Sequence, residues 1–177
     1  MSPSQMTDVP VEVLRSPRRR RTAQARFEQG RLLVMLPAGL EADEEARLVA
    51  DLVAKVRRRI DSEAVDLEKR ARSLAARYRL PRPEEIVWSS RQMRRWGSCT
   101  PADGRIRISD RLASVPGWVL DAVIVHELAH LVVPGHGHDF AELVGRYPLT
   151  ERATGYLMAL ERLDAAPDVM RPPASPG

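Results

Sequence analysis

All four histidines of this 177-residue chain lie within one stretch of 13 residues, and this clustering constrains the fold more than any other feature. The first two, His126 and His130, enclose the motif H-E-L-A-H, which has the form H-E-x-x-H. Because residues four apart lie above one another on a helix, both imidazoles can reach one metal ion, and zinc is the metal bound by such a pair. The motif predicts a zinc-binding helix over residues 116–133.

Glu127 follows the first histidine directly. At that position its carboxylate can reach a water molecule on the metal without binding the metal itself, which is the place of a general base. The alternative interpretation is a buried helix with ordinary core histidines. However, the surrounding segment AVIVHELAHLVV is otherwise apolar, and burying an unpaired glutamate there is costly unless a metal offsets the cost.

A catalytic zinc site needs a third protein ligand and an open fourth position. His136 lies ten residues after His126, the spacing of H-E-x-x-H-x-x-G-x-x-H, although Val133 replaces the glycine of that pattern. We predict that His136 is the third ligand. His138 and Glu151, a glutamate on a later helix, are the alternatives.

Periodicity predicts alternating short strands and helices. We expect strands at 11–16, 85–90, 95–99 and 105–109. Residues 22–37 are expected to form two further strands around a turn at Gln29–Gly30. Besides the zinc-binding helix, helices are expected at 42–60, 62–79, 138–145 and 150–163. Segments 1–10 and 165–177 are rich in Pro, Ser and Ala, so we expect disordered tails around a single domain at 11–164.

Composition narrows the class of protein. The single cysteine, Cys99, excludes an intramolecular disulfide and a zinc site made of several thiolates. We expect Cys99 to be a packed small side chain. No apolar run is long enough to span a membrane, and the first residues lack the apolar core of a signal peptide, so we expect a cytoplasmic protein.

The net charge of +4 is carried by the first 31 residues, which hold seven arginines and three acidic residues. Clusters of arginine occur at 18–21, at 57–59 and at positions 91, 94 and 95. They leave open a nucleotide or nucleic-acid partner. We expect Trp96 to lie in the core or in the wall of the cleft, and Tyr147 and Tyr156 are candidates for stabilising an oxyanion.

Four segments carry a resemblance to a known family: RRWGSCTPADGRIRIS, LASVP, VLDAVIVHELAHL and GHGHDF. They resemble the YgjP-like metallopeptidase family, whose pattern contains R-W-G-S-C, a short hairpin, a proline, V-H-E-L-x-H-L and N-H-S-x-x-F. The resemblance is tight over about residues 85–145 and loose over 11–80. Gly135 replaces the usual Asn, Gly137 replaces the usual Ser, and His138 falls where the family commonly has Pro. These changes flank His136 without removing it.

The resemblance implies a fold and a site. It places the chain among gluzincin-type zinc hydrolases, related to SprT-like proteins, with a zincin-like α+β fold. A small antiparallel sheet would pack on the active-site helix, preceded by an N-terminal β segment and two helices. His126, His130 and His136 correspond to the zinc ligands and Glu127 to the catalytic glutamate. The edge strand of the sheet would line the cleft and pair with an extended peptide.

We therefore expect a zinc-dependent hydrolase, first of all a metallopeptidase that acts on a peptide or protein. One alternative is a nucleotide or phosphate-ester hydrolase in which arginines 91, 94 and 95 bind phosphate. The other is a basic nucleic-acid-associated module with structural zinc. Glu127 argues against this last alternative because a structural site is closed by four protein ligands.

Overall fold

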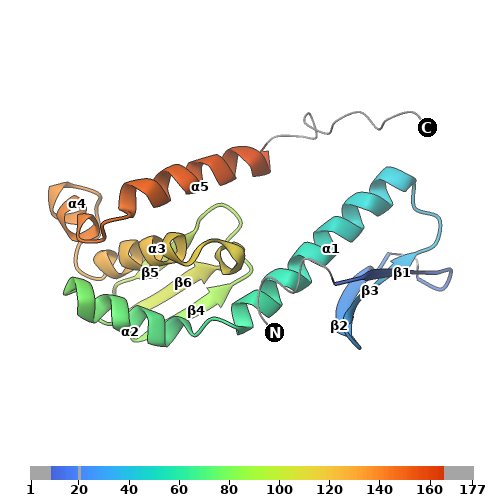
Figure 1. Ribbon diagram of the computed structural model, residues 1–177, viewed down its shortest axis with the longest axis horizontal. Coiled ribbons are helices and arrows are strands. Elements are labelled where there is room, and N and C mark those ends of the chain that lie inside the picture. The colour runs from blue at the N-terminus through green and yellow to red at the C-terminus, as the bar shows by residue number, and fades with distance from the viewer. Residues whose placement is uncertain (1–8, 20, 166–177) are drawn as a thin grey trace.

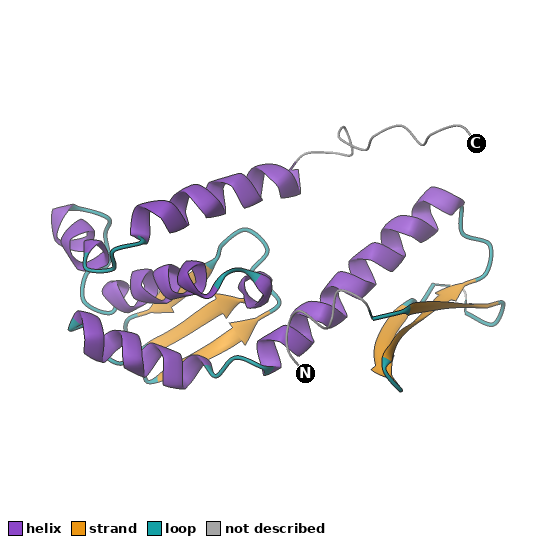
Figure 2. Cartoon of the chain, viewed as in Figure 1, coloured by secondary structure: helices purple, strands orange, loops and turns teal. Residues whose placement is uncertain are grey.

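Two three-stranded sheets and five α-helices make up the part of the protein that the structure describes. Figures 1 and 2 show their arrangement. The computed structural model describes residues 9–19 and 21–165. The strands are β1 (Val11–Ser16), β2 (Gln24–Glu28), β3 (Arg31–Pro37), β4 (Glu85–Ser89), β5 (Gly97–Thr100) and β6 (Arg105–Ser109). The helices are α1 (Ala42–Glu63), α2 (Leu67–Tyr78), the 3₁₀ helix η2 (Asp110–Ser114), α3 (Gly117–His130), α4 (His138–Gly145) and α5 (Thr150–Ala165).

The N-terminal sheet has the strand order β1-β3-β2, with β1 parallel and β2 antiparallel to β3. The predicted turn joins β2 to β3: Gln29 and Gly30 have φ of 49° and 79°, the left-handed conformation that two-residue hairpin turns require. Alternate residues of β3 pack against α1 in a small hydrophobic cluster of their own. Val9 packs against this cluster, and the Pro10 carbonyl accepts a hydrogen bond from the Leu32 backbone N–H. Residues 1–8 and 166–177, which make up most of the two predicted tails, lie outside the described residues.

The second sheet differs from the prediction. Its order is β4-β6-β5, and although β5 and β6 form the expected antiparallel hairpin, β4 is parallel to β6. The sheet is therefore mixed, not antiparallel. After β4 the chain crosses the end of the sheet through residues 90–96, enters the outer strand β5 and returns as β6 between the other two. This path leaves β5 at the edge of the sheet.

Helices α2 and α3 pack on the second sheet, and α5 lies along α3 (Figure 1). Helix α3 is apolar around most of its circumference because it is covered by the sheet, by α2 and by α5. Ile106 and Ile108 of β6 meet Ile124 and Leu128 of α3 in the larger hydrophobic core, and all four side chains are fully buried. The histidine motif thus lies on a rigidly packed helix.

Most predicted helix limits agree with the structure to within a few residues. The exception is the region between the first two helices: α1 continues to Glu63, and α2 begins only at Leu67. The reason is local, since the Asp66 carboxylate accepts a hydrogen bond from the Lys69 backbone N–H and so caps α2 at that point. Among the described residues, no helix has both the length and the apolar character that crossing a membrane requires.

Candidate metal centre

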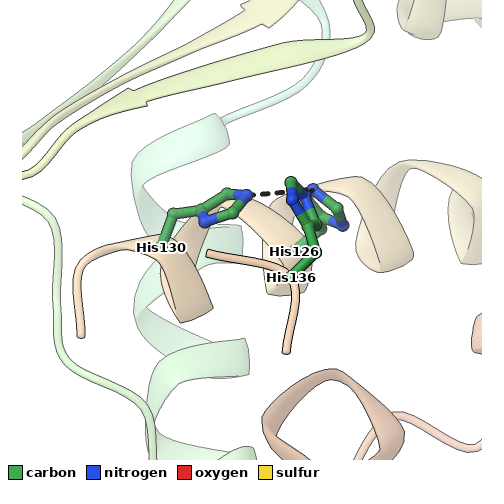
Figure 3. Close-up of side chains that lie close together, drawn as sticks. All are labelled: His126, His130 and His136. Atoms are coloured by element: carbon green, nitrogen blue, oxygen red, sulfur yellow. Dashed lines mark hydrogen bonds between the residues drawn. The ribbon is translucent and has the colours of Figure 1, made fainter. Parts of the chain in front are cut away.

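Three imidazoles converge at the C-terminal end of α3 (Figure 3). His126 and His130 lie one helical turn apart, with 3.2 Å between their Nε2 atoms. His136 comes from the loop between α3 and α4, and its Nε2 lies 3.4 Å from that of His126. The structure thus brings together the three histidines that the spacing singled out.

These distances fit a zinc ion. With Zn–N bonds of ~2.0–2.1 Å and tetrahedral angles, two ligand nitrogens on one zinc lie about 3.4 Å apart. The ligand atoms of the three histidines all lie within 4.8 Å of one another. Three neutral imidazoles with room for a fourth ligand are the donor set of a catalytic zinc site. The donor atoms and their spacing therefore fit the metal predicted from the sequence.

One hydrogen bond fixes the orientation of His130. Its Nδ1 lies 3.0 Å from the backbone carbonyl oxygen of Val133. A carbonyl only accepts, so Nδ1 carries the proton and donates it, which leaves the lone pair on Nε2 directed at the other histidines. Such a partner behind a ligand is the usual way in which proteins orient a metal-binding imidazole.

Phe140 of α4 is packed among the three imidazoles. Its ring stacks on His130 at 4.4 Å between ring centroids, and the centroids of His126 and His136 lie 4.8 Å and 4.7 Å away. The Phe140 side chain is buried. Sequence reasoning did not assign Phe140 a role, although it ends the GHGHDF segment. It holds the loop histidine, His136, against the two helical ones.

The Glu127 carboxyl group lies in the same site, on the side of strand β5. A Cβ atom added at Gly97 would lie 2.5 Å from the Glu127 Oε1, so only glycine leaves space for this side chain. Glu127 is 5% exposed. Burial raises the pKa of Glu127 to about 7, while the positive charge of Arg95 acts in the opposite direction. A carboxyl group with a pKa near neutrality is suited to accept and return a proton.

Burial also affects the other ionisable groups of the site. It lowers the pKa of His126 to about 4, with further lowering by the neighbouring His130 and His136. His126 is therefore neutral at pH 7, as a metal ligand must be. Burial raises the pKa of the Cys99 thiol to about 11, and the nearby carboxylates of Glu127 and Asp103 add to this. Cys99 is thus a protonated thiol in the wall of the site and is not a member of the histidine group.

The histidines and Glu127 open into a cavity of about 650 Å³. One wall is the edge strand β5 with the preceding residues Arg95 and Trp96, and the opposite wall is α5. The residues that α5 contributes are Thr150, Ala153, Thr154, Leu157, Met158 and Glu161. The Trp96 indole N–H donates a 2.7 Å hydrogen bond to Glu161, so the two walls are joined directly. The contribution of α5 could not be read from the sequence because it depends on how α5 packs.

Other predicted candidates lie elsewhere. The His138 side chain is 90% exposed at the start of α4, next to Asp139. Glu151 is exposed on α5 and does not line the cavity. The two tyrosines also lie outside it: the Tyr147 hydroxyl donates to the Trp118 carbonyl, and the Tyr156 ring packs edge-on against Trp118. Arg95 lines the cavity, whereas Arg91 and Arg94 line a separate hollow.

An α+β fold in which a helix presents two histidines and a glutamate, with a third histidine from the next loop, defines a metal-dependent hydrolase site. The comparison with protein families agrees with this class. The family described as YgjP-like, metallopeptidase domain, matches residues 13–157. The chain belongs to the YgjP-like metallopeptidase family. Among curated proteins and among solved structures, no significant match to this chain was found.

Proposed function

We propose that this protein is a zinc-dependent metallopeptidase in which His126, His130 and His136 hold the metal and Glu127 is the general base. The observation that carries the proposal is the convergence of three imidazole Nε2 atoms at 3.2 and 3.4 Å beside a buried carboxyl group. A bound zinc ion lowers the pKa of water and polarises a carbonyl group.

The residues of the chain supply the proton transfers and the positioning. Glu127 accepts a proton from the attacking water molecule and returns it to the leaving amine nitrogen. Without metal, burial raises the pKa of Glu127 to about 7, and a zinc ion nearby would favour the carboxylate form that accepts the proton. Gly97 provides the space in which the carboxylate lies, and β5 holds this glycine in place. His130 keeps its Nε2 lone pair toward the metal by donating from Nδ1 to the Val133 carbonyl.

The cavity favours an extended peptide as the substrate. Among the described residues, strand β5 pairs with β6 on one side only, so the backbone groups on its other edge are available to a further strand. Residues Trp96–Cys99 line the cavity, which places this edge beside Glu127 and the histidines. The apolar side chains of Leu157 and Met158 on α5 form the opposite wall. A peptide between the two walls would present its carbonyl groups to the site.

Charge argues for a peptide rather than a phosphate ester. Transfer of a phosphoryl group needs several fixed cations around the reacting phosphorus. Within the described part of the chain, Arg95 is the one arginine that lines the cavity. The positive charge of Arg95 also interacts with the Glu127 carboxylate.

The experiment compares the zinc-loaded protein with its Glu127→Gln variant on a panel of uncharged quenched peptides and on nucleoside triphosphates. We expect peptide cleavage by the wild type, and a loss of at least ~100-fold in Glu127→Gln, the usual contribution of a general base. Zinc content, measured by elemental analysis, should not change. Glu151→Gln is the matched control because Glu151 is exposed and outside the cavity.

Two results would contradict the proposal. Loss of zinc from Glu127→Gln would mean that Glu127 is a ligand and that the base lies elsewhere. Zinc-dependent release of phosphate or pyrophosphate from nucleotides, with no peptide cleavage, would identify a phosphate-ester hydrolase.

A further inference from the structure

Next to the catalytic cavity is a second hollow of about 490 Å³, lined by arginines. Its lining residues are Ser89, Arg91, Gln92, Met93, Arg94, Arg95 and Arg107. Three of these arginines come from the segment 90–96 that crosses the end of the second sheet, and Arg107 comes from the middle strand β6. Within the described residues the hollow has four positive charges in its lining and no acidic group.

Ion pairing separates the arginines of this hollow from several others in the protein. Arg15 pairs with Glu45, and Arg70 pairs with Asp121. Even Arg105, two residues before Arg107 on the same strand, pairs with Glu85. In residues 9–19 and 21–165, no hydrogen bond or ion pair engages the guanidinium groups of Arg91, Arg94, Arg95 and Arg107. Their charges repel one another and are available to an anion, and the charge of Arg95 also acts on the Glu127 carboxyl group.

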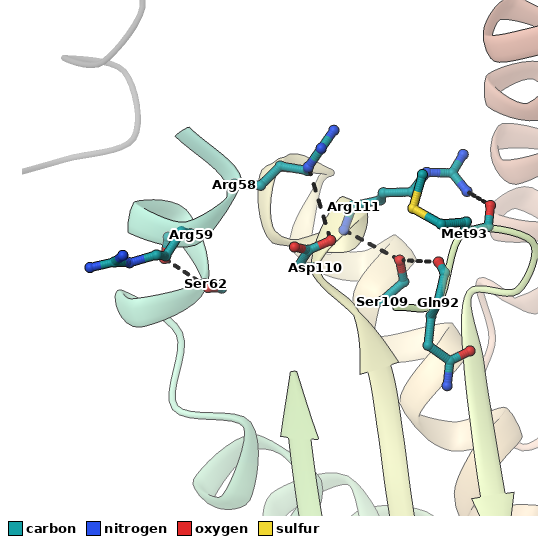
Figure 4. A network of polar contacts seen from close by, with 8 residues as sticks. All are labelled: Arg58, Arg59, Ser62, Gln92, Met93, Ser109, Asp110 and Arg111. Atoms are coloured by element: carbon teal, nitrogen blue, oxygen red, sulfur yellow. Dashed lines mark hydrogen bonds and ion pairs between the residues drawn. The ribbon is translucent and has the colours of Figure 1, made fainter. Parts of the chain in front are cut away.

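The segment that carries these arginines is held in a defined conformation (Figure 4). The buried Ser109 hydroxyl donates to the Gln92 carbonyl at 3.0 Å, and the Arg111 guanidinium donates to the Met93 carbonyl at 3.1 Å. The Gln92 side chain donates to the Ser98 hydroxyl of β5 at 2.6 Å. These bonds attach the segment to β5 and to the end of β6. The backbone from which Arg91, Arg94 and Arg95 project is therefore held in place, which lowers the entropic cost of binding.

Two further contacts involve η2, whose Arg111 is hydrogen-bonded to this segment. The Arg111 guanidinium lies over the Trp96 ring, 4.0 Å from its centroid, and so supports the tryptophan that lines the catalytic cavity. Asp110, next to Arg111, lies 4.0 Å from the Arg58 side chain of α1. Arg95 lines both the hollow and the catalytic cavity, so the two are neighbours.

We infer that the arginine-lined hollow binds an acidic segment of the polypeptide substrate, to one side of the bond that is cut. This inference rests on the proposed peptidase function. A peptide that extends β5 and leaves the cavity past Trp96 would reach Arg95 and then the hollow. The volume of the hollow, about 490 Å³, is large enough for a few side chains of the peptide. A single-stranded nucleic acid is less suited, because the hollow has no aromatic side chain in its described lining on which bases would stack.

The experiment measures binding instead of turnover. The probes are fluorescent peptides of about twelve residues with the same uncharged central part. Two of them carry a block of glutamates, one before and one after the central part. Two counterparts carry glutamines in the same places. Their affinity is measured by anisotropy with zinc-loaded Glu127→Gln protein. We expect one of the two acidic peptides to bind about tenfold more tightly than its glutamine counterpart. This preference should disappear as salt rises from about 0.05 M to about 0.5 M.

The arginine dependence identifies the site. In the Glu127→Gln background, Arg91→Gln with Arg94→Gln should remove the preference and leave binding of the glutamine peptides unchanged. The matched control is Arg72→Gln with Arg82→Gln, which makes the same charge change at exposed positions outside the hollow. Arg107→Gln provides an independent variant, because Arg107 lies on β6 rather than in the crossing segment.

The outcomes separate this inference from the proposed function. Equal binding of acidic and glutamine peptides, or a preference that survives in the arginine variants, overturns the inference even if wild-type protein cleaves uncharged peptides. An arginine-dependent affinity for a single-stranded oligonucleotide without any acidic-peptide preference also overturns it. An arginine-dependent acidic preference supports it, and absence of peptide cleavage by the wild type would then contradict the peptidase function alone.

Discussion

Gly97 of strand β5 and Glu127 of helix α3 are in such close contact that a Cβ atom on the glycine would lie 2.5 Å from the glutamate Oε1 and 2.8 Å from its Cγ. No real side chain tolerates these distances, so either the strand or the glutamate must move when Gly97 is substituted. The contact fixes the carboxylate between the sheet and the histidines. A substitution of Gly97 should therefore move the proposed base, Glu127, without removing it.

Gly97→Ala should therefore displace Glu127 and lower kcat by about 100-fold, the range reached when a catalytic group is misplaced by roughly 1 Å. Zinc content should stay near that of the wild type, because the three atoms nearest to a Cβ at Gly97 all belong to Glu127 and none belongs to a histidine. Steady-state kinetics with an uncharged peptide and elemental analysis test this. Gly155→Ala is the control, since a Cβ atom at Gly155 has open space around it. Full activity in Gly97→Ala would contradict the assigned place of Glu127.

The third ligand is tested by separate alanine substitutions of His136, His138 and Glu151. Loss of one of three protein ligands should weaken zinc binding by orders of magnitude in His136→Ala. The other two variants should bind zinc as the wild type does, because His138 is 90% exposed and Glu151 lies outside the cavity. Competition with a chromophoric chelator measures the affinity. A large loss in Glu151→Ala instead would require a different path of the chain after α3.

Phe140→Leu tests whether the phenyl ring positions the imidazoles. The variant loses the stack on His130 and the edge contacts with His126 and His136. We expect zinc affinity to fall by about tenfold, the lower end for groups that orient metal ligands. Stability of the metal-free protein should fall by roughly 1–2 kcal/mol.

The control for Phe140→Leu is Ile86→Val, a core change in β4 that costs about 0.5–1.5 kcal/mol. Ile86 is 4% exposed and lies on β4, at the opposite edge of the sheet from β5. If both variants lose zinc affinity equally, the effect comes from stability and not from positioning.

The pH dependence of stability in the metal-free protein should depend on Glu127. The folded-state pKa of Glu127 is about 7, above the ordinary value of 4.5, so its contribution to stability is complete below pH 4.5 and is lost as pH rises through 7. The folded-state pKa of His126 is about 4, below 6.5, so its contribution is complete above pH 6.5 and is lost as pH falls through 4. Between pH 4.5 and 6.5 the two effects oppose each other.

Glu127→Gln should remove one of these opposing effects. The free energy of unfolding of the variant minus that of the wild type should increase by about 2–3 kcal/mol when the pH rises from 5 to 8. Urea unfolding in the presence of a chelator at the two pH values measures this difference. A constant difference between variant and wild type across this range would mean that Glu127 titrates at its ordinary pKa.

The sequence by itself determined the features that depend on local spacing. The four-residue step between His126 and His130 puts both histidines on one face of a helix. The apolar residues around them predict that this helix is buried. The Gln29–Gly30 pair predicted the hairpin of β2 and β3 because such turns depend on a few adjacent residues. The family resemblance, confirmed over residues 13–157, was likewise carried by short continuous motifs.

Only the tertiary structure decided which distant segments meet. The parallel pairing of β4 with β6 was missed because strand direction depends on the path of the intervening chain, which residue patterns do not encode. The same reason applies to the contact between Gly97 and Glu127, to the α5 wall with its Glu161–Trp96 hydrogen bond, and to the joining of Arg107 with the arginines of segment 90–96. Each of these brings together residues whose separation along the chain carries no periodic signal, so packing alone places them.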